Sequence, residues 1–315
     1  MTPRILIIAG SDSGGGAGIQ ADIKTVTMLG GHAMTAITAI TAQNTLGVQA
    51  VMPVPTEMVI AQIDSCVSDI GVDAVKIGMI GSAETAHAVA DWLEAHLSAT
   101  PFPGEGLGPV MQADEATRGT RFSDAARLGP GLRRGSDTGR IPIVFDPVMV
   151  ATSGDTLADT ATIAAFERLM AIALVVTPNL PELVALGGEE SVRQRACALL
   201  IKGGHGEGPE IEDVLIDADR SETIWTHRRI DTRHTHGTGC TLASAIAAGL
   251  GDGLSVNAAV DRAIKFVQHA LAAAPGLGAG HGPMGHAFGR VAFYDLLAAT
   301  DGDGWDAAAF RARWA

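Results

Sequence analysis

The chain has 315 residues, with 22 basic and 35 acidic side chains and a net charge of −13. This length allows one large domain or two small ones and is enough for a sizeable core. A composition of 47% hydrophobic and 18% charged residues excludes global disorder. The negative charge argues against binding to nucleic acid or to an anionic membrane surface.

The three cysteines are Cys66, Cys197 and Cys240, which are far apart and form no CxxC pair. This pattern indicates neither a zinc motif nor a disulfide framework and is typical of a reduced compartment. The N-terminal apolar run is too short for a signal peptide, and no apolar stretch approaches the roughly 18 residues of a membrane span. We therefore expect a cytoplasmic protein without a membrane anchor.

Short apolar runs alternate with stretches of helical periodicity along most of the chain. Strands are predicted at residues 4–9, 35–39, 74–77, 142–145, 174–177 and 199–201. Helices are predicted just after the first glycines and at residues 57–70, 83–97, 158–173, 240–251 and 255–274. This alternation predicts βαβ units, and hence an α/β fold with a parallel sheet covered on both faces.

Three other segments depart from this alternation. Residues 213–216 and 222–227 flank a turn and predict a hairpin at an edge of the sheet. Residues 101–140 are rich in glycine, proline and scattered charge, which predicts a mobile surface insertion. Residues 301–315 form a C-terminal tail of unassigned role. We expect a single domain over residues 1–315.

Two glycine-rich loops come just before predicted helices, where backbone N–H groups can converge on an anion. The first, residues 10–22, lacks the third glycine of the dinucleotide fingerprint, and no P-loop motif occurs in the chain. From its residues alone, this loop is either a tight structural turn or a turn that holds a polar ligand.

The second loop, THGTGCT at residues 235–241, has more suggestive chemistry. Gly237 and Gly239 allow a ligand to approach the backbone, and the N–H groups from Thr238 to Cys240 fall in the first turn of a helix. A helix start lowers the pKa of a thiol, which would make Cys240 a base or a nucleophile. The alternative is a small cysteine packed in the core.

Seven motifs occur together in one order: GSDSGGGAGIQADIKT, TAITAQNT, KIGMIGS, FDPVMV, TPNLPE, IKGGH and THGTGCTLASAIAA. With them, the chain resembles the hydroxymethylpyrimidine and phosphomethylpyrimidine kinases of thiamine biosynthesis, in the ribokinase-like superfamily. The resemblance covers most of residues 5–283, apart from the insertion. It implies a three-layer α/β/α sandwich with a mostly parallel central sheet.

The resemblance implies that ATP phosphorylates 4-amino-5-hydroxymethyl-2-methylpyrimidine and then its monophosphate. Gly237, Thr238, Gly239 and Cys240 would form the anion hole, with Thr238 next to the nucleotide. Cys240 would replace the aspartate base of the superfamily. Lys202 would reach the nucleotide phosphates or the transferred group, although a solvated lysine at a strand end is the alternative.

The same resemblance implies roles for polar residues around MgATP. Asp146 and Asn179 would lie near the nucleotide, and Asp146 and Glu182 would act on Mg²⁺, largely through water. Mg²⁺ favours carboxylates and retained waters. A turn aspartate and a carboxylate in the first turn of a helix are the structural alternatives for Asp146 and Glu182.

On the pyrimidine side, the resemblance assigns the polar contacts to Asp22 and Gln43 and the apolar ring contacts to Met79 and Val148. An amide offers the donor and the acceptor that an aminopyrimidine edge requires. Core packing is the alternative for the two apolar residues, and a capping or surface charge is the alternative for Asp22. A homodimer is also implied by the resemblance.

Two positions depart from the family pattern near the phosphates. Gly14 stands where serine is common, and Thr152 stands where lysine is frequent. Loss of a cation at residue 152 would weaken nucleotide binding or the second phosphorylation. Residues 186–199 are also short for a crossover helix, which leaves the local topology open. The rival functions are a pyridoxal kinase and a non-catalytic pyrimidine-binding regulator.

Overall fold

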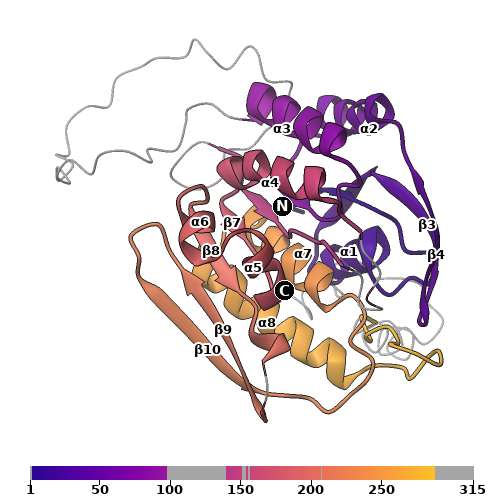
Figure 1. Ribbon diagram of the computed structural model, residues 1–315, viewed down its shortest axis with the longest axis vertical. Helices are drawn as coiled ribbons and strands as arrows, with labels where there is room; N and C mark the ends of the chain where they lie inside the picture. The colour runs from indigo at the N-terminus through magenta and orange to yellow at the C-terminus, as the bar shows by residue number, and fades with distance from the viewer. Residues whose placement is uncertain (1, 98–139, 151–153, 155–156, 207, 288–315) are drawn as a thin grey trace, which may run out of the picture.

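One eight-stranded sheet organises the chain, with the strand order β10-β9-β8-β7-β6-β5-β1-β2 (Figure 1). The computed structural model describes residues 2–97, 140–150, 154, 157–206 and 208–287. The strands are β1 (Arg4–Ala9), β2 (His32–Ile37), β5 (Ala74–Ile77), β6 (Ile143–Phe145), β7 (Val175–Val176), β8 (Ala198–Ile201), β9 (Glu210–Ile216) and β10 (Glu222–Arg228). Neighbours from β2 to β8 pair in parallel, and β9 is antiparallel to both β8 and β10.

Helices cover both faces of this sheet. One face carries α2 (Thr56–Asp69), α3 (Ala83–Leu97) and α4 (Thr160–Ile172), and the other carries α1 (Gly18–Met28), α7 (Thr238–Gly251) and α8 (Val256–Ala272). The three-layer α/β/α architecture with a mostly parallel sheet is confirmed, as is the hairpin at the sheet edge. In the described ranges, no helix is long and apolar enough to cross a bilayer.

Strand β1 shows why its sequence is apolar at every position. Leu6 and Ile8 belong to the core under α2, α3 and α4, whereas Ile5 and Ile7 belong to the core under α1, α7 and α8. All four side chains are fully buried. Successive side chains of a strand point to opposite faces, so a sheet covered on both sides needs a continuous apolar run.

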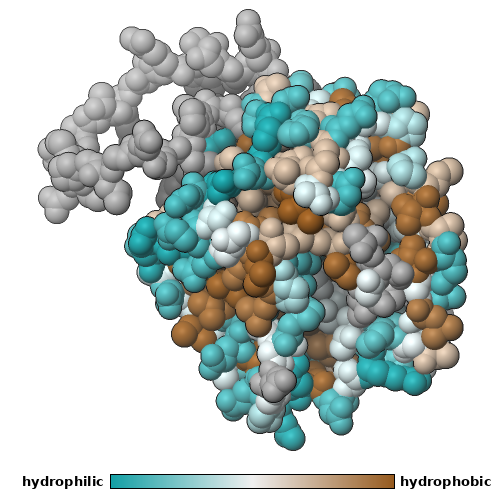
Figure 2. Space-filling view, in the orientation of Figure 1, coloured by the Kyte–Doolittle hydropathy of each residue, from teal (hydrophilic) through white to brown (hydrophobic). Residues whose placement is uncertain are grey.

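The hairpin of β3 (Ala39–Asn44) and β4 (Gly47–Pro53) was not predicted. The strand predicted at residues 35–39 was wrong at its end, because β2 stops at Ile37 and a new strand starts at Ala39. Ile40 and Met52 pair on the outer face of the hairpin, where they are 46% and 58% exposed. Figure 2 shows brown, hydrophobic side chains along the margin that this hairpin occupies in Figure 1.

The open question about residues 186–199 has a simple answer in the structure. Two short helices, α5 (Leu180–Ala185) and α6 (Glu189–Arg193), connect β7 to β8. The two strands still pair in parallel, with Val175 opposite Ala198. The short segment therefore keeps the usual crossover. The tail at residues 301–315, Thr152 and residues 101–139 of the predicted insertion lie outside the described residues.

Candidate active site

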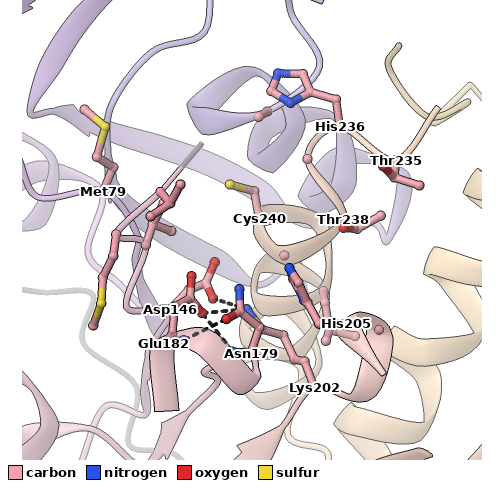
Figure 3. Close-up of a pocket in the computed structure, with 18 of the residues that line it drawn as sticks. Met79, Asp146, Asn179, Glu182, Lys202, His205, Thr235, His236, Thr238 and Cys240 are labelled. Atoms are coloured by element: carbon pink, nitrogen blue, oxygen red, sulfur yellow. Dashed lines mark hydrogen bonds and ion pairs between the residues drawn. The ribbon is translucent and has the colours of Figure 1, made fainter. Parts of the chain in front are cut away.

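The candidate site lies where the parallel strands end. Asp146 directly follows β6, Lys202 directly follows β8, and Met79 lies two residues beyond β5. The first turn of α7 reaches the same edge of the sheet (Figure 3). Ligands of open α/β sheets bind at the carboxyl ends of the strands. A cavity of about 820 Å³ occupies this position.

The cavity brings together nearly all of the site residues expected from the sequence. Those that line it are Gln43, Met79, Asp146, Val148, Asn179, Glu182, Lys202, Gly237, Thr238, Gly239 and Cys240. They come from segments far apart in the chain. Asp22 is the exception, because it is not part of the cavity wall.

A charged cluster forms one part of the cavity wall. The Nζ atom of Lys202 lies 2.7 Å from Oδ1 of Asp146 and 3.6 Å from Oε2 of Glu182. Thr177 donates its hydroxyl to the same oxygen of Asp146, at 3.0 Å. Burial disfavours the ammonium group, but attraction to Asp146 and Glu182 outweighs it and raises the pKa of Lys202. Lys202 is therefore a fixed cation facing the cavity.

Asn179 and Glu182 cap the helix α5 reciprocally. The Asn179 side chain accepts from the Glu182 backbone N–H at 2.9 Å, and the Glu182 carboxylate accepts from the Asn179 N–H at 2.8 Å. Burial raises the pKa of Glu182, against the attraction of Lys202. The capping role coexists with a place in the cavity wall, since a capping box uses only part of each side chain.

Gly237 and Gly239 bring the start of α7 close to its neighbours. Gly237 has a φ of +85°, and a Cβ there would collide with the carbonyl oxygen of Gly16. A Cβ on Gly239 would lie 3.3 Å from Nζ of Lys202 and 3.4 Å from Oδ2 of Asp146. The glycine at residue 239 leaves a space beside a cation that a side chain would fill.

The backbone at the start of α7 provides hydrogen-bond donors to this space. The Thr241 N–H makes the first intrahelical bond, to the Gly237 carbonyl at 2.9 Å. The N–H groups of Gly239 and Cys240 precede it, in the part of a helix where donors have no partner within the helix. Together with the helix dipole and Lys202, they suit a phosphoryl group.

The prediction of a lowered thiol pKa at Cys240 was wrong for the ligand-free protein. Burial raises the pKa of Cys240 to about 11, while Lys76 and a hydrogen bond from the Gly18 backbone N–H act in the opposite direction. The helix start is present as expected, but removing the thiolate from water has the larger effect. Cys240 is a protonated thiol at neutral pH.

Asp22 does not face the cavity, contrary to its expected contact with the pyrimidine. Its side chain is fully buried and lies 2.9 Å from Nζ of Lys76. Ser244 donates its hydroxyl to the other carboxylate oxygen at 2.7 Å. A capping or surface charge, the alternative drawn from the sequence, is wrong, because the residue belongs to a buried ion pair.

His236 and Asp12, which lie beside Gln43, were given no role in the site from the sequence, where His236 was expected to be a hydrogen-bonded loop histidine and not a metal ligand. Nε2 of His236 is 2.9 Å from Oδ2 of Asp12 and 3.4 Å from the Gln43 amide nitrogen. Asp12 also accepts the N–H groups of Gly16 and Ala17, at 2.9 and 2.7 Å. Although burial opposes the charge on Asp12, these bonds lower its pKa. The aspartate thus connects the two glycine-rich loops.

Gly14, one of the two departures from the family pattern, lies in the same loop. Its N–H donates to Oδ1 of Asp12 at 2.8 Å. A Cβ at this position would lie 3.2 Å from that oxygen and 3.2 Å from the Gln43 carbonyl. The glycine therefore fits a loop that is tightly packed around Asp12.

A polar chain at another part of the cavity wall was also missed. Oδ2 of Asp213 lies 3.0 Å from Nε2 of His227, and the Gln268 amide nitrogen lies 2.9 Å from Nδ1 of the same ring. The carboxylate accepts only, so the imidazole donates to Asp213 and a neutral ring then accepts from Gln268. The nearby cavity-lining residues Ile211, Ile230, Ile264, Val267 and Leu271 are apolar. Because His227 and Gln268 are 41 residues apart in the sequence, no local motif indicated this contact.

The fold and the site define a small-molecule kinase of the ribokinase-like class. Structures of such kinases resemble the chain closely. An ADP complex of Bacillus subtilis pyridoxal kinase has a TM-score of 0.71 and 28% identity, covering 92% of this chain and 100% of that one. A phosphomethylpyrimidine kinase from Clostridium difficile has a TM-score of 0.62 and 29% identity, covering 85% of this chain and 98% of that one.

Sequence comparison identifies the family, within this class of kinases, to which the chain belongs. Residues 12–121 and 133–285 match the profile of the family described as phosphomethylpyrimidine kinase. A hydroxymethylpyrimidine/phosphomethylpyrimidine kinase of Rhizobium meliloti is 43% identical over 303 residues, covering 91% of this chain and 97% of that protein. The chain belongs to the phosphomethylpyrimidine kinase family, as its sequence motifs indicated.

Proposed function

We propose that this protein transfers the γ-phosphoryl group of ATP to the hydroxymethyl oxygen of 4-amino-5-hydroxymethyl-2-methylpyrimidine, and then phosphorylates the monophosphate. Membership of the family and the curated relatives support this activity. The observation that carries the site assignment is the position of Cys240 and the α7 N–H groups in one cavity with Lys202 and Asp146 (Figure 3).

The pyrimidine would bind at the part of the cavity lined by Gln43, Met79 and Val148. The Gln43 amide would contact the polar ring edge, and the two apolar side chains would pack against the ring. Val148 is partly buried and follows Asp146 by two residues, so it joins this region to the phosphate region. The hydroxymethyl group would then point toward Cys240.

In the transfer step, the substrate hydroxyl oxygen forms a bond to the γ-phosphorus. The bond between that phosphorus and the bridging oxygen breaks, which releases ADP. The hydroxyl proton passes to the Cys240 thiolate, which forms when the thiol first loses its own proton to water. The N–H groups of Gly239 and Cys240 and the Lys202 ammonium would hold the charge on the transferred group. Phosphoryl transfer depends chiefly on such positioning and charge stabilisation.

The residues around Lys202 fit Mg²⁺ through water. Asp146 and Glu182 offer carboxylates at the cavity, whereas the described residues contain no group of three or more His, Cys, Asp or Glu side chains arranged as a metal site. Mg²⁺ commonly keeps several waters and binds one or two carboxylates together with phosphates. When bound, the cation neutralises phosphate charge. Asp146, Glu182 and Asn179 would hold it and the nucleotide.

The base of the nucleotide would occupy the apolar region beside Gln268. Because the Gln268 amide nitrogen is directed at His227, its carbonyl oxygen is the group left to accept from a ligand. That oxygen suits the exocyclic amino group of adenine. It does not suit the carbonyl oxygen that guanine carries at the same position, since two acceptors do not pair.

Pyridoxal kinase activity is the second candidate function. The structural likeness to the Bacillus subtilis pyridoxal kinase favours it, and both substrates present a hydroxymethyl group on a nitrogen heterocycle. We also propose that the protein is a cytoplasmic homodimer. Light scattering at micromolar protein that shows a monomer would refute the dimer.

The test is to incubate the protein with MgATP and the hydroxymethylpyrimidine, with pyridoxine in a parallel reaction, and to identify products by mass spectrometry. Diphosphate is the expected product. Monophosphate alone would contradict the second phosphorylation. It would be consistent with the loss of a cation at Thr152, where the family frequently has lysine. Turnover of pyridoxine in preference would support the second candidate. Binding of the pyrimidine without ATP consumption would indicate the non-catalytic regulator.

A further inference from the structure

A buried ion pair lies next to the site but outside its cavity. Lys76 on β5 and Asp22 on α1 are both fully inaccessible to solvent, with Nζ 2.9 Å from Oδ2. Ser244 on α7, also fully buried, donates to the other Asp22 oxygen at 2.7 Å. The pair thus connects the central sheet to two helices on one face. The mechanism above does not use these three side chains.

The local sequence makes room for the lysine head group. A Cβ on Gly78 would lie 2.7 Å from Nζ of Lys76 and 3.3 Å from Cβ of Ala9. Any side chain at residue 78 would therefore displace the ammonium. A buried ion pair stabilises a fold no better than apolar side chains of similar size, so stability alone is a weak reason for this arrangement.

The same face of α7 carries Cys240. Residues four apart on a helix lie one above the other, which places Cys240 one turn from Ser244, on the side of the cavity. Lys76 and Cys240 interact electrostatically. Lys76 therefore acts on the thiol from behind the cavity wall, where a bound substrate does not reach it.

The groups that act on Cys240 come from several elements. The Gly18 N–H at the start of α1 donates to the Cys240 sulfur. Lys76 is the cation with the largest effect on the Cys240 thiol. Lys202 is a second cation that interacts with it. The carboxylates of Asp22 and Asp146 oppose them. Burial leaves the thiol with a raised pKa despite the two cations, so forming the thiolate depends on them.

We propose that Lys76, held by Asp22 and Ser244, is a positioning residue that supplies the counter-charge for the Cys240 thiolate. Asp22 then acts on this cation and not on the pyrimidine. The proposal rests on the role of Cys240 as base in the proposed function. Asp22 and Lys76 have opposite effects on the thiolate, because one carries a negative and the other a positive charge.

The experiment measures the alkylation rate of Cys240 by iodoacetamide in the full-length protein, with mass spectrometry of the modified peptides. Cys66 and Cys197 are internal controls in the same reaction. At pH 8, Lys76→Met should slow alkylation of Cys240 about tenfold, the effect of one pKa unit. Asp22→Asn should accelerate it. Lys265→Met, an exposed lysine on α8, should leave the rate unchanged.

Opposite shifts in the two variants support the proposal, whereas equal rates or shifts of the same sign overturn it, because a merely structural pair would disturb Cys240 alike in both. If Lys76→Met fails to fold, the double variant Lys76→Met with Asp22→Leu replaces it. Its alkylation should still be slowed, because Lys76 has the larger effect of the two on Cys240. An unchanged rate in the double variant would refute the proposal.

Steady-state kinetics separates this proposal from the proposed function. Lys76→Met should lower kcat in step with the thiolate and leave the KM for the pyrimidine unchanged. A raised KM with an unchanged kcat would overturn the proposal. If Cys240→Ala keeps full turnover, Cys240 is not the base and the proposed function loses that step. The alkylation rates would still report whether Lys76 controls the thiol.

Discussion

The two parts of the cavity are built differently. The phosphate region is charged and rests on the main sheet, where Asp146 and Lys202 directly follow β6 and β8. The pyrimidine region is neutral at Gln43 and Met79, and Gln43 belongs to a hairpin outside the main sheet. This difference predicts that changes in the phosphate region reduce kcat, whereas changes in the pyrimidine region raise KM.

Cys240→Ala is the strongest test of the phosphate region. Removing the general base should lower kcat on the order of 10²- to 10⁴-fold. Pyrimidine affinity should change little, because the backbone donors of α7 stay in place. Steady-state kinetics and calorimetric titration with the pyrimidine measure the two effects. Cys66→Ala on α2, away from the cavity, is the matched control. Full turnover in Cys240→Ala would remove the thiol from the mechanism.

Gln43→Leu tests the pyrimidine region. Loss of the amide would leave the polar edge of the substrate unpaired, at a cost of about 1 to 3 kcal/mol, or roughly 5- to 150-fold in the KM for the pyrimidine. The KM for ATP should stay the same, because the Gln43 amide contacts Thr41 and His236 and not the Lys202 cluster. An equal rise in both KM values would erase the distinction between the two regions.

Much of the phosphate region could be predicted from the sequence. Asp146, Lys202 and the THGTGC loop follow apolar strands or precede a helix, and the ends of parallel strands meet at one edge of a sheet. The order and type of most elements of the main sheet, and of the helices that cover it, followed from their apolar periodicity. The family motifs then assigned residues to the site, and all of these except Asp22 line the cavity.

The rest depended on contacts that spacing does not encode. The pKa of Cys240 followed burial and not the helix start, and the depth of a side chain depends on the whole fold. Asp22 turned inward because Lys76, 54 residues later, lies 2.9 Å away. The β3–β4 hairpin was missed because apolar residues lie on its exposed face, which obscures the usual alternation of a strand.

Gln268→Leu tests the nucleotide end of the cavity, where Gln268 is proposed to accept a hydrogen bond from adenine. The substitution removes the acceptor proposed for the adenine amino group and should reduce the preference for ATP over GTP by about tenfold, as expected for one hydrogen bond. The kcat with saturating ATP should remain within about twofold. Competition between ATP and GTP at fixed pyrimidine measures the preference. An unchanged preference would mean that Gln268 does not distinguish adenine from guanine.

Asp12→Asn tests whether the pyrimidine region is held in place by charge. The Asp12 pKa lies below its ordinary value of 3.8, because the bonds from His236 and the backbone N–H groups outweigh burial. A carboxyl with a lowered pKa in the folded state stabilises the protein fully above that ordinary value. It loses this contribution as the pH falls through the folded-state pKa, where both states bind the proton.

Urea unfolding of the Asp12→Asn variant and the unaltered protein should therefore differ by about 1 to 3 kcal/mol at pH 7. The difference should be similar at pH 5 and should narrow as the pH falls below about 3.8. Asp231→Asn, an exposed carboxyl, is the control and should show no such pH dependence. A difference that stays constant down to pH 3 would show that Asp12 holds the two glycine loops by shape alone, without its charge.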